Sequence, residues 1–317
     1  MKGDKILLAG AHGMVGNAMR RTLTTAGFCD ILTPPRWEVD WTNLDDTCLY
    51  FHENRPTVVI VAAAKVGGIL YNDSAPLSFL RENLEIELNI LRAASEYCNV
   101  RKLLFMGSSC IYPRDAGLPI KETSLMSGPL EKTNEAYALA KIVGVKMCEF
   151  ISRSNPSKQF FSVMPTNLYG IRDTYDPLRS HVIPAMIYKF ERAKKRGEKS
   201  VTLPGTGTAL REFLYADDLA KACLALLRVN TPLPSVINIG SPEEVTILEL
   251  AEMVKAATGF KGKLLFDGDA RLDGTRRKRL DCSLLHSLVH WVPEVSLLEG
   301  LPRAVRDFRL SSAYQEL

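Results

Sequence analysis

The sequence predicts an α/β fold in which a doubly wound parallel sheet is joined to a smaller C-terminal lobe. Three observations predict it: short apolar runs bounded by Gly, Ser or Pro, helical periods between these runs, and a glycine-rich turn after the first run. Such runs are typical of strands that are buried on both faces, and strands alternating with helices indicate βαβ units. With 317 residues, 46% of them hydrophobic, the chain can bury a sheet domain and an attached lobe.

The expected elements follow one another through the first half of the chain. Strands are predicted at Lys5–Ala9, near Asp30–Thr33, and at Val58–Ala62, Lys102–Phe105 and Phe161–Val163. Helices are predicted at Met14–Ala26, 79–97 and Tyr137–Ile151, the middle one from Leu80, Leu84, Leu88, Ile90 and Leu91.

After Pro165 the pattern is less regular, and two further helices are expected near 217–228 and 246–258. We expect residues 1–165 to form the sheet domain, with a segment of about 212–242 returning to it. Residues 166–317 would then form mainly the second lobe, built from several excursions of the chain.

Charge and cysteine content restrict the class of protein. The net charge of +4 comes from interspersed residues without a long basic block, so no nucleic-acid partner is expected. The densest cluster, Arg271 to Arg279, is either a solvated surface run or a contact for a phosphate-bearing ligand. The seven cysteines are scattered without a close CxxC pair, which favours a reduced, cytoplasmic setting.

Two further classes are not expected. No apolar run is long enough to span a bilayer, so we expect a soluble protein without a membrane partner. His286 and His290 have the helical spacing of a metal pair, but no glutamate stands between them and no third ligand is evident. We therefore expect these histidines to be structural and the protein to hold no metal.

A glycine-rich loop stands between the first predicted strand and the first predicted helix. Its glycines permit a tight turn that lets backbone N–H groups and the helix N-terminus face a pyrophosphate. The spacing GxxGxxG resembles that of the extended short-chain dehydrogenases, so we expect a Rossmann-type sheet that binds a dinucleotide. The residues expected to contact this cofactor are Gly10, His12, Gly13, Met14, Val15 and Gly16.

The end of the second predicted strand indicates which dinucleotide is bound. An NAD site usually places an acidic residue here to hold the ribose 2′-hydroxyl, whereas this chain has Pro34-Pro35-Arg36. Arg36, with His12 assisting, is expected to hold the 2′-phosphate of NADP. The alternative is that Arg36 is an ordinary surface charge.

The spacing of three residues predicts reductase chemistry. Tyr137 and Lys141 stand four residues apart, on one face of a helix. The lysine charge is expected to lower the pKa of the phenol, which makes Tyr137 a usable acid and base. Ser108, just after the fourth strand, can hydrogen-bond the same substrate oxygen as the tyrosine.

Five longer motifs stand out in the chain: Ala62-Ala-Ala-Lys-Val-Gly-Gly-Ile69, Gly107-Ser-Ser-Cys-Ile-Tyr-Pro113, Pro165-Thr-Asn-Leu-Tyr-Gly170, Ser180-His-Val-Ile-Pro184 and Arg211-Glu-Phe213. Together they closely resemble the GDP-L-fucose synthase family, whose members epimerise C3 and C5 of GDP-4-keto-6-deoxy-D-mannose and reduce C4 with NADPH. The resemblance runs from the first strand to roughly Asp281 and is densest between residues 58 and 215.

The resemblance implies roles for residues that a simple reductase would not need. Cys110 would be the base and His181 the acid of the epimerisation. Tyr137 would steady the enolate oxygen and later protonate O4. Cys110 is otherwise a small buried hydrophobe and His181 a satisfied loop histidine. The cofactor contacts implied beyond the glycine loop and Arg36 are Lys141, Pro165, Asn167, Leu168 and His181.

The resemblance also implies the contacts of the GDP-sugar. Lys189 and Arg211 would neutralise its diphosphate, and Asp273 would hold ribose or base hydroxyls. The chain departs from the family pattern at Pro204, where tryptophan is usual, at Ile171-Arg172, and at Leu272. These departures affect the fit of the nucleotide and the sugar. A homodimer is expected through the helices near 79–97 and 137–151.

Two other functions are compatible with the general pattern. One is an NAD-dependent sugar-nucleotide 4-epimerase, against which Cys110 and Arg36 argue. The other is a non-catalytic NADP-binding sensor module, which could lose Tyr137 or Lys141 freely, whereas both are present.

Overall fold

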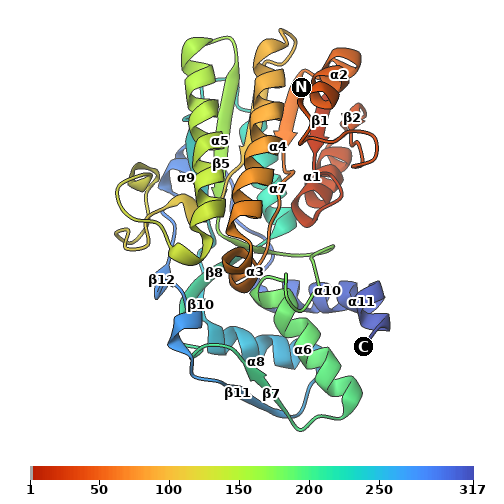
Figure 1. The fold of residues 1–317 in the computed structure, drawn as a ribbon, viewed down its shortest axis with the longest axis vertical. Coiled ribbons are helices and arrows are strands. Elements are labelled where there is room, and N and C mark those ends of the chain that lie inside the picture. The colour runs from red at the N-terminus through yellow and green to blue at the C-terminus, as the bar shows by residue number, and fades with distance from the viewer. Residues whose placement is uncertain (1–2) are drawn as a thin grey trace.

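The computed structural model describes residues 3–317 and consists of a sheet domain with a smaller lobe beneath it (Figure 1). The main sheet has six parallel strands in the order β2-β1-β3-β4-β5-β9. Their bounds are β1 Ile6–Ala9, β2 Ile31–Leu32, β3 Val58–Val61, β4 Lys102–Met106, β5 Gln159–Pro165 and β9 Val236–Ile239. The strand order reverses between β1 and β3, where folds of this kind bind their ligands. The predicted fold class is confirmed.

Helices cover both faces of this sheet (Figure 1). One face packs against α1 (Met14–Thr25), α7 (Ala216–Leu227) and α9 (Ser283–Leu288). The other face packs against α2 (Leu44–Asn54), α4 (Pro76–Glu96) and α5 (Glu135–Ser154). Because both faces are covered, all four residues of β1 are fully buried, which explains why the strand reads as a continuous apolar run.

The apolar positions that predict α4 divide between two sides of the helix. Ile90 and Leu91 are fully buried, whereas Leu88 is 38% exposed. The buried side also contains Asn83 and Glu87, two polar residues one turn apart. The core-facing side of α4 therefore includes a carboxylate.

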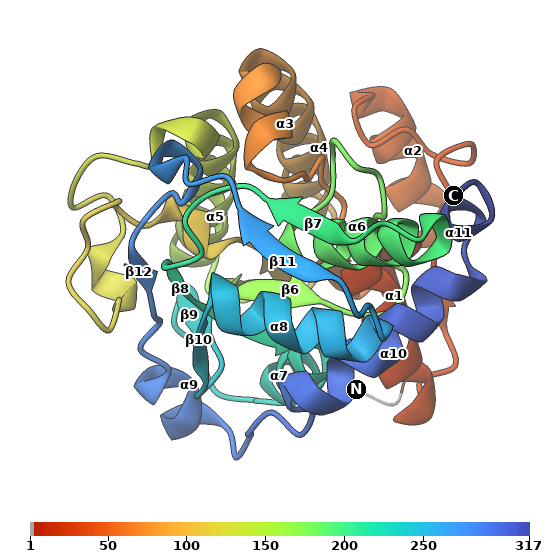
Figure 2. The same ribbon diagram turned by 90° about the horizontal axis from the view of Figure 1, so that it is seen from below.

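The smaller lobe is built from later parts of the chain and is seen from below in Figure 2. Its helices are α6 (Val182–Arg196), α8 (Ile247–Thr258), α10 (Leu297–Leu310) and α11 (Ser312–Gln315). Its strands are β6 (Asn167–Tyr169), β7 (Ser200–Leu203), β8 (Leu210–Tyr215), β10 (Glu244–Thr246), β11 (Lys263–Phe266) and β12 (Arg277–Lys278). Helix α8 begins with a capping box between Thr246 and Glu249, the arrangement that satisfies free N–H groups at a helix start. A separate hydrophobic core, which includes Phe190, Phe260 and Phe308, holds the lobe together.

The chain passes between the two parts more than once. Strand β5 ends at Pro165, and β6 starts at Asn167 beside β8 of the smaller lobe. Helix α7 and strand β9, which lie within the stretch of about 212–242, pack in the layers of the sheet domain. The boundary at residue 165 itself stays a prediction.

No helix among residues 3–317 combines the length and the apolar character needed to cross a membrane.

Candidate active site

The glycine loop lies at the carboxyl end of β1 and is folded tightly against its neighbours. Gly10 has a φ of +85°, and a Cβ there would lie 2.5 Å from the backbone nitrogen of Ala63. A Cβ on Gly16 would overlap the carbonyl oxygen of Gly10. Both positions need glycine for the packing of the protein itself.

Gly13 serves a different purpose. A Cβ at Gly13 would come no closer than 3.7 Å to its nearest neighbouring atom, the carbonyl oxygen of Gly10. Helix α1 starts at the next residue without a side-chain cap and without an acidic residue in its first turn. In contrast, Asn43 caps α2 by accepting two backbone N–H groups. The open N-terminus of α1 therefore fits the pyrophosphate of a dinucleotide.

Arg36 lies in the turn after β2, the strand next to β1, and its side chain is exposed. Hydrogen bonds from Thr42 hold the pKa of Asp40 below its usual range, and the charge of Arg36 adds to this effect. His12 is exposed in the neighbouring glycine loop. The two basic side chains are therefore available to an anionic ligand at this edge of the sheet.

Cys110, Ser108 and Tyr137 meet beyond the end of β4. The Ser108 hydroxyl caps the short helix η1 (Ser109–Ile111) by accepting the N–H of Cys110 at 3.2 Å. The Ser108 hydroxyl is also close enough to the Tyr137 phenol to lower its pKa. The side-chain amide of Asn134 donates to the Cys110 sulfur at 3.2 Å. The predicted catalytic serine, cysteine and tyrosine thus lie together, and Asn134, which donates to the cysteine sulfur, is a neighbour that the motif reading missed.

Lys141 is buried beneath this group, and its ammonium contacts a carboxylate. Its Nζ lies 2.8 Å from Oε1 of Glu87, and both side chains are almost completely excluded from solvent. The same Nζ lies 4.7 Å from the centre of the Phe105 ring and 5.8 Å from that of Tyr137. The lysine charge is therefore compensated within the protein.

This arrangement corrects the expected effect of Lys141 on the tyrosine. Burial raises the pKa of Tyr137 above its usual value, and negative charge at Cys110 and Glu87 raises it further. The Ser108 hydroxyl acts in the opposite direction without outweighing burial. The expected lowering of the Tyr137 pKa is wrong for this structure, because burial has the largest effect on that pKa and raises it.

His181 stands at the start of α6, in the smaller lobe. Desolvation by the surrounding protein lowers the pKa of His181. The backbone N–H of Gly68 donates to the Arg179 carbonyl at 2.9 Å, which anchors the segment before His181 to the loop after β3. A Cβ on Gly68 would overlap the carbonyl oxygen of Ser180. Gly68 therefore permits the contact that places His181.

Three basic side chains of the smaller lobe bear on the site, and two of them, Arg211 and Lys278, lie within electrostatic range of Cys110. Lys189 of α6 is half-buried, and burial lowers its pKa. Arg211 of β8 donates at 2.8 Å to the backbone carbonyl of Asp273. Lys278 of β12 is in register with Arg211, and burial lowers its pKa while negative charge at Cys110 opposes that effect.

Lys278 belongs to the charged cluster from Arg271 to Arg279 that the sequence left open. Within that cluster Arg271 pairs with Asp269 at 2.7 Å and Arg277 with Glu244 at 2.6 Å. Lys278 faces Arg211 and Cys110 instead. One residue of the run is therefore directed at the site while its neighbours form surface ion pairs.

Asp273 holds a loop of the protein itself. Its carboxylate accepts the backbone N–H of Thr206 at 2.8 Å and the Thr206 hydroxyl at 2.6 Å. A Cβ on Gly205, whose φ is +87°, would lie 2.5 Å from the same carboxylate. Asp273 thus fixes the turn after Pro204, the position where the family has tryptophan.

The remaining predicted cofactor contacts lie at the end of β5 and the start of β6. Pro165 is the last residue of β5, and the side chain of Asn167 donates to the backbone carbonyl of Glu212 at 2.9 Å. Leu168 packs against the core of the sheet domain.

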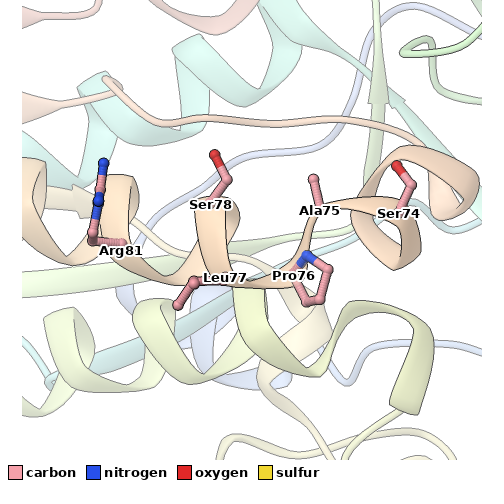
Figure 3. Close-up of a pocket in the computed structure, with 6 residues that line it drawn as sticks. All are labelled: Ser74, Ala75, Pro76, Leu77, Ser78 and Arg81. Carbon is pink, nitrogen blue, oxygen red and sulfur yellow. The ribbon is translucent and has the colours of Figure 1, made fainter.

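A hollow at the start of α4 is a separate feature (Figure 3). It is lined by Ser74, Ala75, Pro76, Leu77, Ser78 and Arg81, and none of these residues is assigned to the site.

The contact of Gly68 with Ser180 generates a prediction. Gly68→Ala is expected to lower the free energy of unfolding by about 1–3 kcal/mol, because the methyl group meets backbone rather than a flexible side chain. Backbone amides of residues 176–181 should exchange with deuterium faster than in the parent protein. Gly117→Ala is the matched control, since a Cβ there meets nothing within 4 Å. Equal exchange in the parent and both variants would contradict the anchoring role.

Comparison with known proteins identifies the family. The model of the NAD dependent epimerase/dehydratase family matches residues 6–240. A protein of Oryza sativa subsp. japonica described as probable GDP-L-fucose synthase 1 is 48% identical over 300 residues, covering 95% of this chain and 90% of that protein. The GDP-L-fucose synthase of Escherichia coli (strain K12) is 42% identical over 316 residues, covering 97% of each chain.

The fold comparison agrees with these relatives. The crystal structure of a GDP-L-fucose synthetase from Naegleria fowleri bound to NADP has a TM-score of 0.86 at 27% identity, covering 97% of this chain and 94% of that chain. The likeness extends over both lobes, because the covered part includes nearly the whole chain. The chain belongs to the NAD dependent epimerase/dehydratase family, and within it to the GDP-L-fucose synthases.

Proposed function

We propose that this protein converts GDP-4-keto-6-deoxy-D-mannose to GDP-L-fucose by inverting C3 and C5 and then reducing C4 with NADPH. The observation that carries the proposal is the position of Cys110, whose backbone N–H donates to Ser108 and whose charge acts on the pKa of Tyr137. A simple ketone reductase needs the serine and the tyrosine but has no use for a thiol beside them. The likeness of nearly the whole chain to GDP-L-fucose synthases supports the same reaction.

The first stage is a proton exchange next to the sugar ketone. A ketone at C4 makes the hydrogens at C3 and C5 acidic, and a thiolate is a suitable base near neutral pH. Cys110 removes such a proton while Ser108 and Tyr137 hold the enolate oxygen. His181 supplies a proton from the smaller lobe, so that the carbon receives hydrogen on the other side.

The second stage uses the same tyrosine as an acid. NADPH, when bound, supplies the hydride for C4. Tyr137 gives its phenolic proton to O4, and Ser108 keeps that oxygen in place through its hydroxyl. Lys141 would hold the cofactor from the side of the tyrosine, and Pro165, Asn167 and Leu168 would contribute further cofactor contacts.

The substrate is held by its nucleotide diphosphate. Lys189 and Arg211 neutralise the phosphates, as the family resemblance implies, and Lys278 adds a third positive charge beside Arg211. Asp273 contributes a hydroxyl contact from the carboxylate that also holds Thr206. The assignment of the base and ribose contacts depends on the turn after Pro204, because this chain lacks the usual tryptophan there.

We also propose a homodimer formed through α4 and α5, which pack side by side on the outer face of the sheet domain (Figure 1). Five large apolar side chains on these two helices are between 38% and 74% exposed: Leu77, Leu88, Leu139, Val143 and Phe150. Exposed apolar residues grouped on adjacent helices are typical of protein interfaces.

The proposed reaction is tested by incubating the protein with GDP-4-keto-6-deoxy-D-mannose and NADPH in deuterated water. We expect NADPH to be consumed and GDP-L-fucose to form with solvent deuterium at C3 and C5, as measured by NMR. A product that keeps the manno configuration and carries no deuterium would show a plain C4 reductase. No consumption of NADPH would reject the reaction altogether.

The role of Cys110 generates a second prediction. Cys110→Ser is expected to lower the rate of deuterium incorporation at C3 and C5 by about 100-fold or more, since a serine hydroxyl is a much weaker base than a thiol. Slow reduction to an unepimerised 6-deoxy sugar should remain, because Ser108, Tyr137 and Lys141 are intact. Cys98→Ser, at an exposed position, is the matched control. Deuterium incorporation at the parent rate would exclude Cys110 as the base.

The preference for NADPH rests on Arg36 and generates a third prediction. Arg36→Ala is expected to weaken NADPH binding by about 10- to 100-fold, the effect of losing charged hydrogen bonds to the 2′-phosphate. Binding of NADH should change little, because that phosphate is absent. Titration of both cofactors by fluorescence measures the difference. An equal loss for the two cofactors would remove Arg36 from the 2′-phosphate site.

A further inference from the structure

Arg192 of α6 has a buried hydrogen-bond donor without an acceptor. Its Nε is shielded from solvent, and no residue between 3 and 317 accepts a hydrogen bond from it. The residue as a whole is half-buried, so part of the guanidinium is accessible to a ligand. Buried polar groups in native proteins nearly always have a partner. The unused donor capacity of Arg192 therefore needs an explanation.

Arg192 also lies beside another cation that has no ion pair. Lys189 stands one turn earlier on α6, and the charge of Arg192 lowers the pKa that burial of Lys189 has already lowered. Within residues 3–317 neither side chain forms an ion pair, although Asp267 acts on Lys189 from a distance. Glu191 of the same helix is unavailable to them, because it pairs with Arg309 at 2.6 Å. Two like charges so close repel each other, so the pair fits a ligand that supplies acceptors.

The order of residues along α6 follows the order of groups in a GDP-sugar. His181, the proposed acid for the sugar ring, stands at the helix start, and Lys189 is the proposed contact of the diphosphate. With a rise of 1.5 Å per residue, Lys189 lies about 12 Å from His181 along the axis, and Arg192 about 4–5 Å further. At 3.6 residues per turn, all three project within about 80° of one another. Arg192 is therefore on the nucleobase side of the diphosphate contact.

The turn after β7 faces this part of α6. Strand β7 lies beside α6 (Figure 2), and Pro204 follows it at an exposed position. Asp267 accepts the backbone N–H of Gly205 at 2.9 Å and also acts on the charge of Lys189, which relates the turn to the helix. Asp273, the proposed contact of the ribose or the base, holds the same turn. The nucleobase end of the proposed site is therefore expected between this turn and α6.

The turn itself offers little to the polar edge of a base. Pro204 has no polar side-chain atom, and its ring is smaller than the tryptophan that is usual in the family. The carboxylate of Asp273 can accept hydrogen bonds but cannot donate them. The acceptors on a nucleobase edge therefore need donors from elsewhere, and Arg192 has one to spare.

We propose that Arg192 recognises the guanine of the GDP-sugar by donating from its guanidinium to O6 and N7 of the base. A planar guanidinium matches these two neighbouring acceptors, as it does when proteins read guanine in DNA. Adenine carries an amino group, itself a donor, in place of O6, and pyrimidines lack N7. Arg192 would thus determine specificity for the nucleotide. The assignment rests on the proposed function, because it takes a GDP-sugar as the ligand.

The test compares three nucleoside diphosphates that share the diphosphate and differ in the base. Binding of GDP, IDP and ADP is measured by isothermal titration calorimetry without keto sugar. IDP retains O6 and N7 and lacks only the amino group at C2. We expect Arg192→Gln to weaken GDP and IDP by about 10-fold or more, the effect of losing a bidentate contact, and to change ADP far less.

Arg192→Lys separates the base from the diphosphate, because it keeps the charge and loses the planar fork. It should bind ADP as the parent does and lose the preference for GDP over ADP. Arg196→Gln is the matched control, since it removes the same charge from an exposed position in the last turn of α6. This control should bind all three nucleotides as the parent does.

An analogue of the ligand gives a second readout. In 7-deaza-GDP a carbon replaces N7, so the parent should bind it at least about fivefold more weakly than GDP. Arg192→Gln should bind the two ligands equally, because the partner of N7 is gone. A residue with only a structural role would leave the penalty for 7-deaza-GDP unchanged.

The variants should fold, because Arg192 has no partner in the protein to leave unpaired. Their melting temperatures should therefore stay close to that of the parent, and if Arg192→Gln does not fold, Arg192→Lys still decides the question.

The outcomes separate this assignment from the proposed function. Equal weakening of GDP, IDP and ADP would place Arg192 at the diphosphate and overturn its role in reading the base. Parent-like binding of GDP by Arg192→Gln and Arg192→Lys would overturn that role as well and leave the proposed function standing. A parent protein that binds none of the three nucleotides would reject the GDP-sugar substrate, and the assignment of Arg192 with it.

Discussion

The contact between α4 and α5 is the constraint on which the site depends. It buries Glu87 against Lys141 and thereby fixes the ammonium beneath Tyr137. A buried pair of this kind contributes little net stability, but an unpaired member would be costly, so each charge requires the other. The outer side of the same helix pair carries the exposed apolar residues assigned to the dimer. The proposed chemistry and the proposed dimer therefore depend on one packing arrangement.

The two lobes contribute different parts of the proposed mechanism. The sheet domain supplies the glycine loop, Ser108, Cys110 and Tyr137, whereas the smaller lobe supplies His181 and the basic residues for the diphosphate. The hydrogen bond from Gly68 to Arg179 ties the segment before His181 to the sheet domain. A base from one lobe and an acid from the other can approach a sugar ring from different sides, which inversion of a carbon requires. A plain 4-epimerase, the nearest alternative, would need neither of them.

The sequence predicted the sheet and the core of the site because both are local signals. A strand buried on both faces is a continuous apolar run, and a glycine loop is contiguous, so β1 and Gly10 are visible without tertiary information. Glu87 was missed because a glutamate inside a helix resembles a solvated one. Only the register of α4 against Gly144 of α5 shows that it is buried. Lys278 was missed because its run includes Arg277, which does pair at the surface.

The central claim is that one pocket performs both reactions on one bound sugar. The most direct measurement is a crystal structure of the Cys110→Ser variant with NADPH and GDP-4-keto-6-deoxy-D-mannose. We expect O4 within hydrogen-bond distance of the Ser108 and Tyr137 hydroxyls, with residue 110 facing a hydrogen on C3 or C5 and His181 on the opposite side of the ring. A sugar bound with C4 turned away from Tyr137, or with residue 110 out of reach of both carbons, would contradict the account.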